Sequence, residues 1–291
     1  MADIFVDDIR SVLCENLEYI WLYLIYPIIA AVFLPWKKEE DLLENIYGGI
    51  QTSSKASLKL SNLRGKLGLY SLRLNGFKTH RKVYARFQSN SGKETGCELG
   101  DILILSKYMD LARLYSRMCC LLQLKVEKKR RSGGWHIDKV QLELFSGWPM
   151  LKELYTVKPK EILAKSLRIK PENRFFSSYL FAKRNRIFAF PHICPSFEAM
   201  FVSGTDLVRA ACLTSHSFHG PLEIPFSTAL MQTLFQVSGE YDLLGHVVVN
   251  KSLNILVKKL IRHIGMNDPP AGEGRPLIAL IFTAERFERL Q

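Results

Sequence analysis

The spacing of apolar and polar positions predicts a helical N-terminal part of the chain. Residues 3–18 place their apolar side chains on one side of a helix. Residues 37–50 form an amphipathic pattern that closes on the pair Gly48-Gly49, a common stop signal for a helix. Between these two segments, residues 19–36 contain no charged side chain. We therefore expect helices up to residue 50.

From residue 51 onward the pattern changes to that of strands. Alternating or continuous apolar runs predict strands at 57–63, 82–88, 101–105, 116–127 and 136–145. The sequence Ser132-Gly133-Gly134 predicts a turn, so the last two strands should form a hairpin.

The C-terminal half predicts helices followed by one buried strand. Helical spacing covers residues 201–215, 225–239 and 246–264, and a continuous apolar run at 277–285 is typical of a buried strand. We expect this tail to cover one face of the sheet. The fold class is therefore α/β, a mixed sheet flanked by helices, with an apolar helical segment at 1–36, a core at 37–150 and a C-terminal extension at 151–291.

The apolar segment, residues 19–36, could contact a membrane or a partner subunit. Its 18 residues are just long enough to span a bilayer. Lys37 and Lys38 follow it and acids dominate the other flank, so a span would leave the rest of the chain in the cytosol. Pro27 would kink a lone helix. The alternative is a buried helix pair broken at Pro27, or the interface of a homo-oligomer.

Composition indicates a basic protein of a reducing compartment. Lys and Arg number 40 and Asp and Glu 28 among 291 residues, a net charge of +12, which favours a polyanionic partner such as nucleic acid or an anionic membrane. The six cysteines form no C-x-x-C pair and are too few for a disulfide scaffold, which indicates a cytoplasmic protein. The first ten residues carry three acids and one Arg, so we expect no signal peptide.

Three polar residues on neighbouring predicted strands are candidates for a metal- and phosphate-binding site. Asp101 begins one strand, and Gln123 and Lys125 lie two apart on the next, so their side chains share a face. Polar groups in an apolar strand are costly unless they are paired or coordinate something. Carboxylate and amide oxygens suit Mg²⁺, and a lysine can counter charge on a phosphate. The ordinary alternative is a turn cap at Asp101 and an exposed lysine at position 125.

The segments around these residues resemble a known family. Residues 98–103 read ELGDIL, 121–125 read LLQLK and 141–149 read QLELFSGWP. Over 98–149 the chain resembles the PD-(D/E)xK nuclease superfamily, and a group of uncharacterised bacterial restriction-type proteins with the same three segments. The resemblance implies a restriction-endonuclease-like sheet, Asp101, Gln123 and Lys125 as catalytic residues, Mg²⁺ or Mn²⁺ as cofactor, and bacterial genome defence.

The resemblance is inexact at one position of the site. The family has Glu or Asp where Gln123 stands, so the site has one negative charge fewer for holding a cation. The family also places a Glu on the helix that precedes the sheet. Glu44 is the natural candidate and Glu40 the second. The predicted metal ligands are thus Asp101, Gln123 and Glu44.

Two basic clusters are candidate contacts with nucleic acid. The first, directly after the QLK strand, is formed by Lys128, Lys129, Arg130 and Arg131. The second is formed by Lys183, Arg184 and Arg186, near Phe181 and Phe188. Such residues bind backbone phosphates, and the aromatic rings could stack on bases. Ordinary solvated surface is the alternative.

The sequence therefore predicts a metal-dependent phosphodiesterase, an endonuclease with DNA as the favoured substrate. The alternative is a non-catalytic, matrix-like scaffold that binds nucleic acid or a membrane and retains a degenerate site. Neither interpretation assigns a role to most of residues 151–291.

Overall fold

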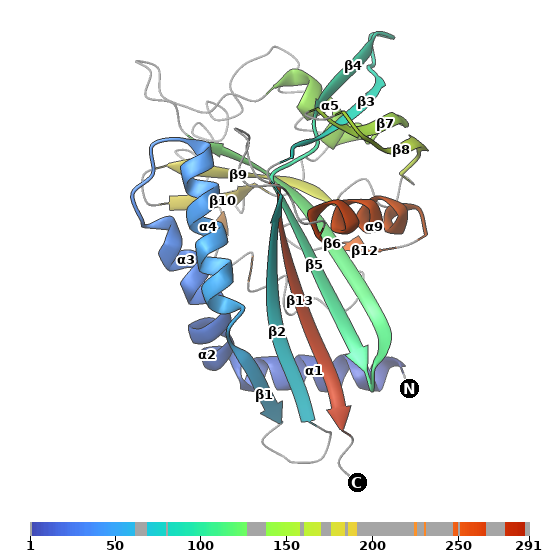
Figure 1. Ribbon diagram of the computed structural model, residues 1–291. Helices are drawn as coiled ribbons and strands as arrows, with labels where there is room; N and C mark the ends of the chain where they lie inside the picture. Colours follow the sequence, from blue (N-terminus) through green and yellow to red (C-terminus); the bar gives the residue numbers. More distant parts are fainter. Residues whose placement is uncertain are drawn as a thin grey trace, which may run out of the picture.

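The computed structural model is an α/β protein built on two sheets (Figure 1). It describes residues 2–61, 69–79, 81–126, 138–157, 160–169, 176–183, 186–190, 224–225, 230, 247–249, 251–265 and 277–288.

The helices come mainly from the N-terminal part of the chain. They are α1 (Ala2–Glu15), α2 (Leu17–Ile20), the π-helix η1 (Trp21–Ile25), α3 (Tyr26–Val32), α4 (Glu39–Ser53), α5 (Lys139–Gly147) and α9 (Lys251–Gly265). The strands are β1 (Ser57–Ser61), β2 (Leu69–Thr79), β3 (Val83–Gln88), β4 (Glu94–Glu98), β5 (Ile102–Asp110), β6 (Arg113–Val126), β7 (Leu151–Thr156), β8 (Ile162–Leu167), β9 (Ser177–Lys183), β10 (Arg186–Phe190), β11 (Ile224–Pro225), β12 (Val247–Val248) and β13 (Leu277–Glu288).

The larger sheet is mixed and, over the described residues, has nine strands. Eight follow the order β1-β2-β13-β5-β6-β9-β10-β11, and β12 pairs with β6 beside them. The β13–β5 and β6–β9 pairs are parallel and the other pairs are antiparallel. This confirms the predicted mixed sheet flanked by helices, with a helical N-terminal segment.

The smaller sheet is antiparallel, with the order β4-β3-β7-β8. The chain passes from it into the larger sheet between the end of β4 and the start of β5, through Leu99, Gly100 and Asp101. The predicted site therefore lies where the two sheets meet.

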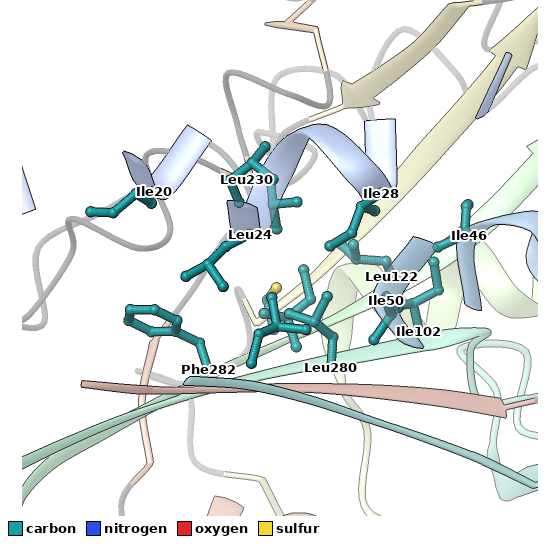
Figure 2. Close-up of a cluster of buried hydrophobic side chains, with 14 of the residues drawn as sticks. Ile20, Leu24, Ile28, Ile46, Ile50, Ile102, Leu122, Leu230, Leu280 and Phe282 are labelled. Carbon is teal, nitrogen blue, oxygen red and sulfur yellow. The ribbon is translucent and has the colours of Figure 1, made fainter. Parts of the chain in front are cut away.

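Two cores lie on opposite faces of the larger sheet. One joins the N-terminal helices to the sheet; Figure 2 shows Ile20, Leu24 and Ile28 gathered with Ile102, Leu122 and Leu280. The other joins the sheet to α5, α9 and the smaller sheet. In β5 and β6, successive side chains enter one core and then the other, which is why both strands read as almost continuous apolar runs.

The segment at 136–145 is a helix in part and not the predicted strand. Helix α5 begins after Asp138, whose Oδ1 accepts hydrogen bonds from the backbone N–H groups of Val140 (2.8 Å) and Gln141 (3.2 Å). Such a cap stabilises the first turn of a helix by about 1 kcal/mol. The predicted hairpin is wrong because this cap, and burial of Leu144 and Phe145, favour a helix over the alternating pattern.

The C-terminal strand lies inside the sheet and does not cover it. The predicted strand at 277–285 corresponds to β13, which lies between β2 and β5. The larger sheet therefore contains strands from both sides of the predicted boundary at residue 150. The helix predicted over 246–264 is α9, which begins at Lys251 after the short strand β12. The helices predicted at 201–215 and 225–239 fall outside the described residues, apart from Pro225 and Leu230.

In the described part of the chain, no single helix has the length and apolar composition to cross a membrane. One pair of helices has them together, Val6–Glu15 and Leu17–Val32, but it is bent by 75° at the break.

Candidate active site

Asp101 is fixed by backbone hydrogen bonds to two neighbouring strands. Its N–H donates to the carbonyl of Leu122 on β6, and its carbonyl accepts from the N–H of Ile278 on β13, both at 2.8 Å. Its side chain is completely buried. The carboxylate is therefore held rigidly at the start of β5 and is not the solvated turn cap of the alternative interpretation.

One oxygen of this carboxylate is well satisfied and the other is not. Asp101 Oδ2 accepts from the N–H of Leu124 at 2.8 Å and from the side-chain amide of Gln123. Asp101 Oδ1 has no hydrogen-bond partner among the residues that the structure describes. A buried polar atom without a partner costs about 1–3 kcal/mol, so this oxygen is a natural place for a ligand.

Gln141 on α5 completes a chain of amide hydrogen bonds. Its Nε2 donates to the backbone carbonyl of Glu98 at 3.1 Å and to Oε1 of Gln123. Because a carbonyl can only accept, the Glu98 carbonyl orients Gln141, which in turn orients Gln123 with its amino group toward Asp101. Gln141 belongs to the family-like QLELFSGWP segment, but the sequence analysis gave it no role; its burial within a helix is visible only in the structure.

The charges around Asp101 are mixed. Burial raises the pKa of Asp101 well above its ordinary value, and the nearby Glu98 and Glu39 raise it further. The ammonium of Lys125 and the Leu124 N–H oppose this rise in pKa. Lys125 and Glu98 are only half-buried, so the cluster reaches the surface through them. The structure therefore brings Asp101 and Gln123 into contact, and the charge of Lys125 acts on the pKa of Asp101. A catalytic role for the three residues stays a prediction.

Glu44 is not part of this cluster. Its carboxylate pairs with Lys78 on β2 at 2.8 Å. Lys78 is in register with Ile278, and Ile278 with Ile102, so it lies two strand spacings from β5, about 10 Å. The helical acid that influences Asp101 is Glu39, in the first turn of α4. The amphipathic pattern predicts the helix but not which of its acids overlies the end of β5.

The donor set fits a divalent cation in part. Among the described residues, no group of three or more His, Cys, Asp or Glu side chains could hold a metal ion. Mg²⁺, however, is usually held by one or two carboxylates together with water and phosphate oxygens. The buried, unpartnered Oδ1 of Asp101 suits such an ion. Oε1 of Gln123, the ligand atom that the sequence predicts, accepts one hydrogen bond from Gln141, which leaves one of its two lone pairs for a cation.

The basic clusters are described only at their margins. Lys128, Lys129, Arg130, Arg131 and Arg184 lie outside the described residues. The backbones of Lys183 and Arg186 face each other across the β9–β10 pair. A contact of these residues with nucleic acid stays a prediction.

Comparisons of the chain with protein-family models, curated proteins and solved structures found no match. The structure thus defines an α/β protein whose mixed sheet carries a buried Asp–Gln–Gln hydrogen-bond network. Its relation to the PD-(D/E)xK superfamily stays a prediction.

Proposed function

We propose that this protein is a metal-dependent phosphodiesterase that cleaves DNA, with Asp101 and Lys125 as its central residues. The observation that carries the proposal is the fully buried Oδ1 of Asp101, which has no hydrogen-bond partner among the described residues, in a carboxyl group whose pKa the Lys125 ammonium lowers. A role in bacterial genome defence would follow from the family resemblance.

Each residue of the site would have a distinct role in phosphodiester hydrolysis. Asp101, with Glu39, would hold a divalent cation, because Glu98 pairs with Lys82 at 2.9 Å. When bound, the cation would act as a Lewis acid on the phosphate. Lys125 would stabilise the negative charge that develops on the phosphate during attack by water. Gln123 and Gln141 would position Asp101 through the amide chain.

One observation favours the second candidate function, a non-catalytic scaffold that binds nucleic acid or a membrane. The side-chain amide of Gln123 donates a hydrogen bond to the Asp101 carboxylate. This hydrogen bond stabilises the carboxylate in the absence of a cation. In that case the network would only stabilise the junction between the sheets, and the net charge of +12 would serve binding alone.

Plasmid cleavage distinguishes the two functions. The full chain is incubated with supercoiled plasmid and Mg²⁺ or Mn²⁺, beside the variants Asp101→Asn and Lys125→Met. We expect metal-dependent cleavage by the unchanged protein and a loss of at least about 100-fold in both variants. DNA binding, measured in parallel by fluorescence anisotropy, should persist in each.

The matched control is Lys107→Met. Lys107 is also a half-buried lysine on the larger sheet, but it lies six positions along β5 from Asp101, roughly 20 Å away. This variant should cleave like the unchanged protein. DNA binding without cleavage in either metal would reject the nuclease and support the scaffold.

A further inference from the structure

The N-terminal helices carry an apolar surface on their outer side. Tyr19, Leu22, Tyr23, Tyr26, Phe33 and Leu34, here named the apolar stripe, are each between 46% and 58% exposed. Their spacing of three, four or seven residues places the first four on one side of the continuous α2–η1–α3 helix. In Figure 1 this helix lies along the outer margin of the molecule.

The opposite side of the same helix belongs to the protein core. Ile20, Leu24, Ile25 and Ile28 are fully buried, and Figure 2 shows three of them packed toward the sheet. A membrane span would withdraw these side chains from the core and would expose the apolar sheet residues that they cover, such as Ile102 and Leu122, to water. It would also have to straighten the 75° bend before Leu17. The segment can therefore lie on a membrane but cannot cross it without losing the fold.

The outer side is unusual for a helix packed on a soluble sheet. Such helices place charged or polar side chains toward water, yet residues 19–36 have none that is charged. The stripe is bordered by exposed Glu18 at one end and by exposed Lys37 and Lys38 at the other. An exposed apolar surface of this kind marks a binding surface.

The side chains of the stripe fit a lipid interface. Three of the six are tyrosines, whose apolar rings and polar hydroxyls suit the headgroup level of a bilayer. The Lys37–Lys38 pair and the net charge of +12 are complementary to anionic lipids, whereas lysine is depleted from interfaces between proteins.

We propose that the apolar stripe docks the protein on an anionic lipid bilayer, with α2 and α3 lying in the plane of the interface. Binding of this kind combines shallow burial of apolar side chains with attraction between basic residues and anionic headgroups. The proposal is independent of the nuclease function.

Vesicle co-sedimentation tests the proposal with the full chain. Vesicles of phosphatidylcholine alone are compared with vesicles of phosphatidylcholine and phosphatidylglycerol. We expect the protein to pellet with the anionic vesicles, to be released by alkaline carbonate, and to bind at least about tenfold less tightly as the double variant Leu22→Glu/Tyr26→Glu.

The matched control is Ile255→Glu on α9, which changes an apolar side chain that is also half exposed, at 48%, on another helix. It should bind like the unchanged protein, and circular dichroism should show that all variants fold. Equal pelleting of the double variant and the control would overturn the proposal. The proposal would also be overturned if no form pelleted with vesicles and light scattering showed a dimer of the unchanged protein but a monomer of the double variant. The stripe would then bind a second copy of the chain.

Discussion

At the scale of single residues, the two carboxylate oxygens of Asp101 differ in their hydrogen bonds. The N–H of Leu124 and the amide of Gln123 donate to Oδ2, while the buried Oδ1 has no partner within the described part of the chain. Burial and the nearby acids Glu98 and Glu39 favour the protonated form and raise the pKa of Asp101. Without a cation, the charged form of this residue is therefore a source of instability.

The substitution Asp101→Asn should stabilise the protein at neutral pH. Because the folded-state pKa lies above the ordinary 3.8, the folded state binds more protons, and the contribution of Asp101 to stability falls as pH rises from about 3.8 through the folded-state pKa. Asn keeps an acceptor for Leu124 and does not ionise. We expect its free energy of unfolding in urea at pH 7 to exceed that of the unchanged protein, with the gain shrinking toward pH 4.

Asp41→Asn is the control of opposite sign. The backbone N–H groups of Lys37 and Lys38 bond to Asp41 and lower its pKa, so this carboxylate stabilises the fold above its ordinary pKa and loses that effect in acid. Asp41→Asn should therefore reduce stability at pH 7 but not in acid. The same pH dependence in both variants would contradict the assignment for Asp101.

At the scale of elements, the packing of α4 depends on one of two adjacent glycines. The sequence predicts that the helix ends at Gly48-Gly49, but it continues to Ser53. A Cβ at Gly49 would lie 2.6 Å from the carbonyl oxygen of Pro27 and 2.7 Å from Cα of Ile28, whereas one at Gly48 would meet nothing within 4 Å. Gly49 therefore permits close contact between α3 and α4 and is not a helix stop.

Alanine at these two positions should have opposite effects. Gly49→Ala forces the backbones of α3 and α4 apart and should lower the free energy of unfolding by about 1–3 kcal/mol. Gly48→Ala improves helix propensity in open space and should raise it by up to about 1 kcal/mol. Urea unfolding of the two variants measures both effects. Equal destabilisation would mean that helix packing does not depend on Gly49.

At the scale of the whole molecule, an arginine of the C-terminal strand forms an ion pair with the N-terminal helix. Arg286 on β13 bonds to Asp8 on α1 at 3.1 Å and to Asp110 at the end of β5 at 2.8 Å. Arg286 and Asp8 are each only 6% exposed. Since β13 also lies between β2 and β5, the central sheet is complete only when the C-terminal strand is in place.

Removal of this arginine should destabilise the entire fold. Arg286→Met leaves the carboxylate of Asp8 buried without its cation, and breaking a buried pair in this way costs about 3–5 kcal/mol. Arg73→Met is the control, because Arg73 pairs with Glu285 at the surface, with 51% of its side chain exposed, and such pairs contribute about 0–1 kcal/mol. Denaturant unfolding compares the two, and similar losses would show that the buried pair adds nothing special.

Elements with strong local patterns, and the proximity of Asp101 to Gln123, can be predicted from the amino-acid sequence. The apolar runs of β5, β6 and β13 and the amphipathic pattern of α4 are local, and the period of two places Gln123 and Lys125 on one face.

Which further groups contact Asp101 and Gln123 depends on the packing of distant segments. Gln141 reaches Gln123 because α5, and not a strand, follows β6. The acid of α4 that raises the pKa of Asp101 is Glu39, in the first turn of the helix, whereas Glu44 pairs with Lys78. The same packing places β13 in the centre of the sheet. Periodicity along a chain encodes which side of an element is buried, whereas the neighbour that buries it depends on contacts between distant segments.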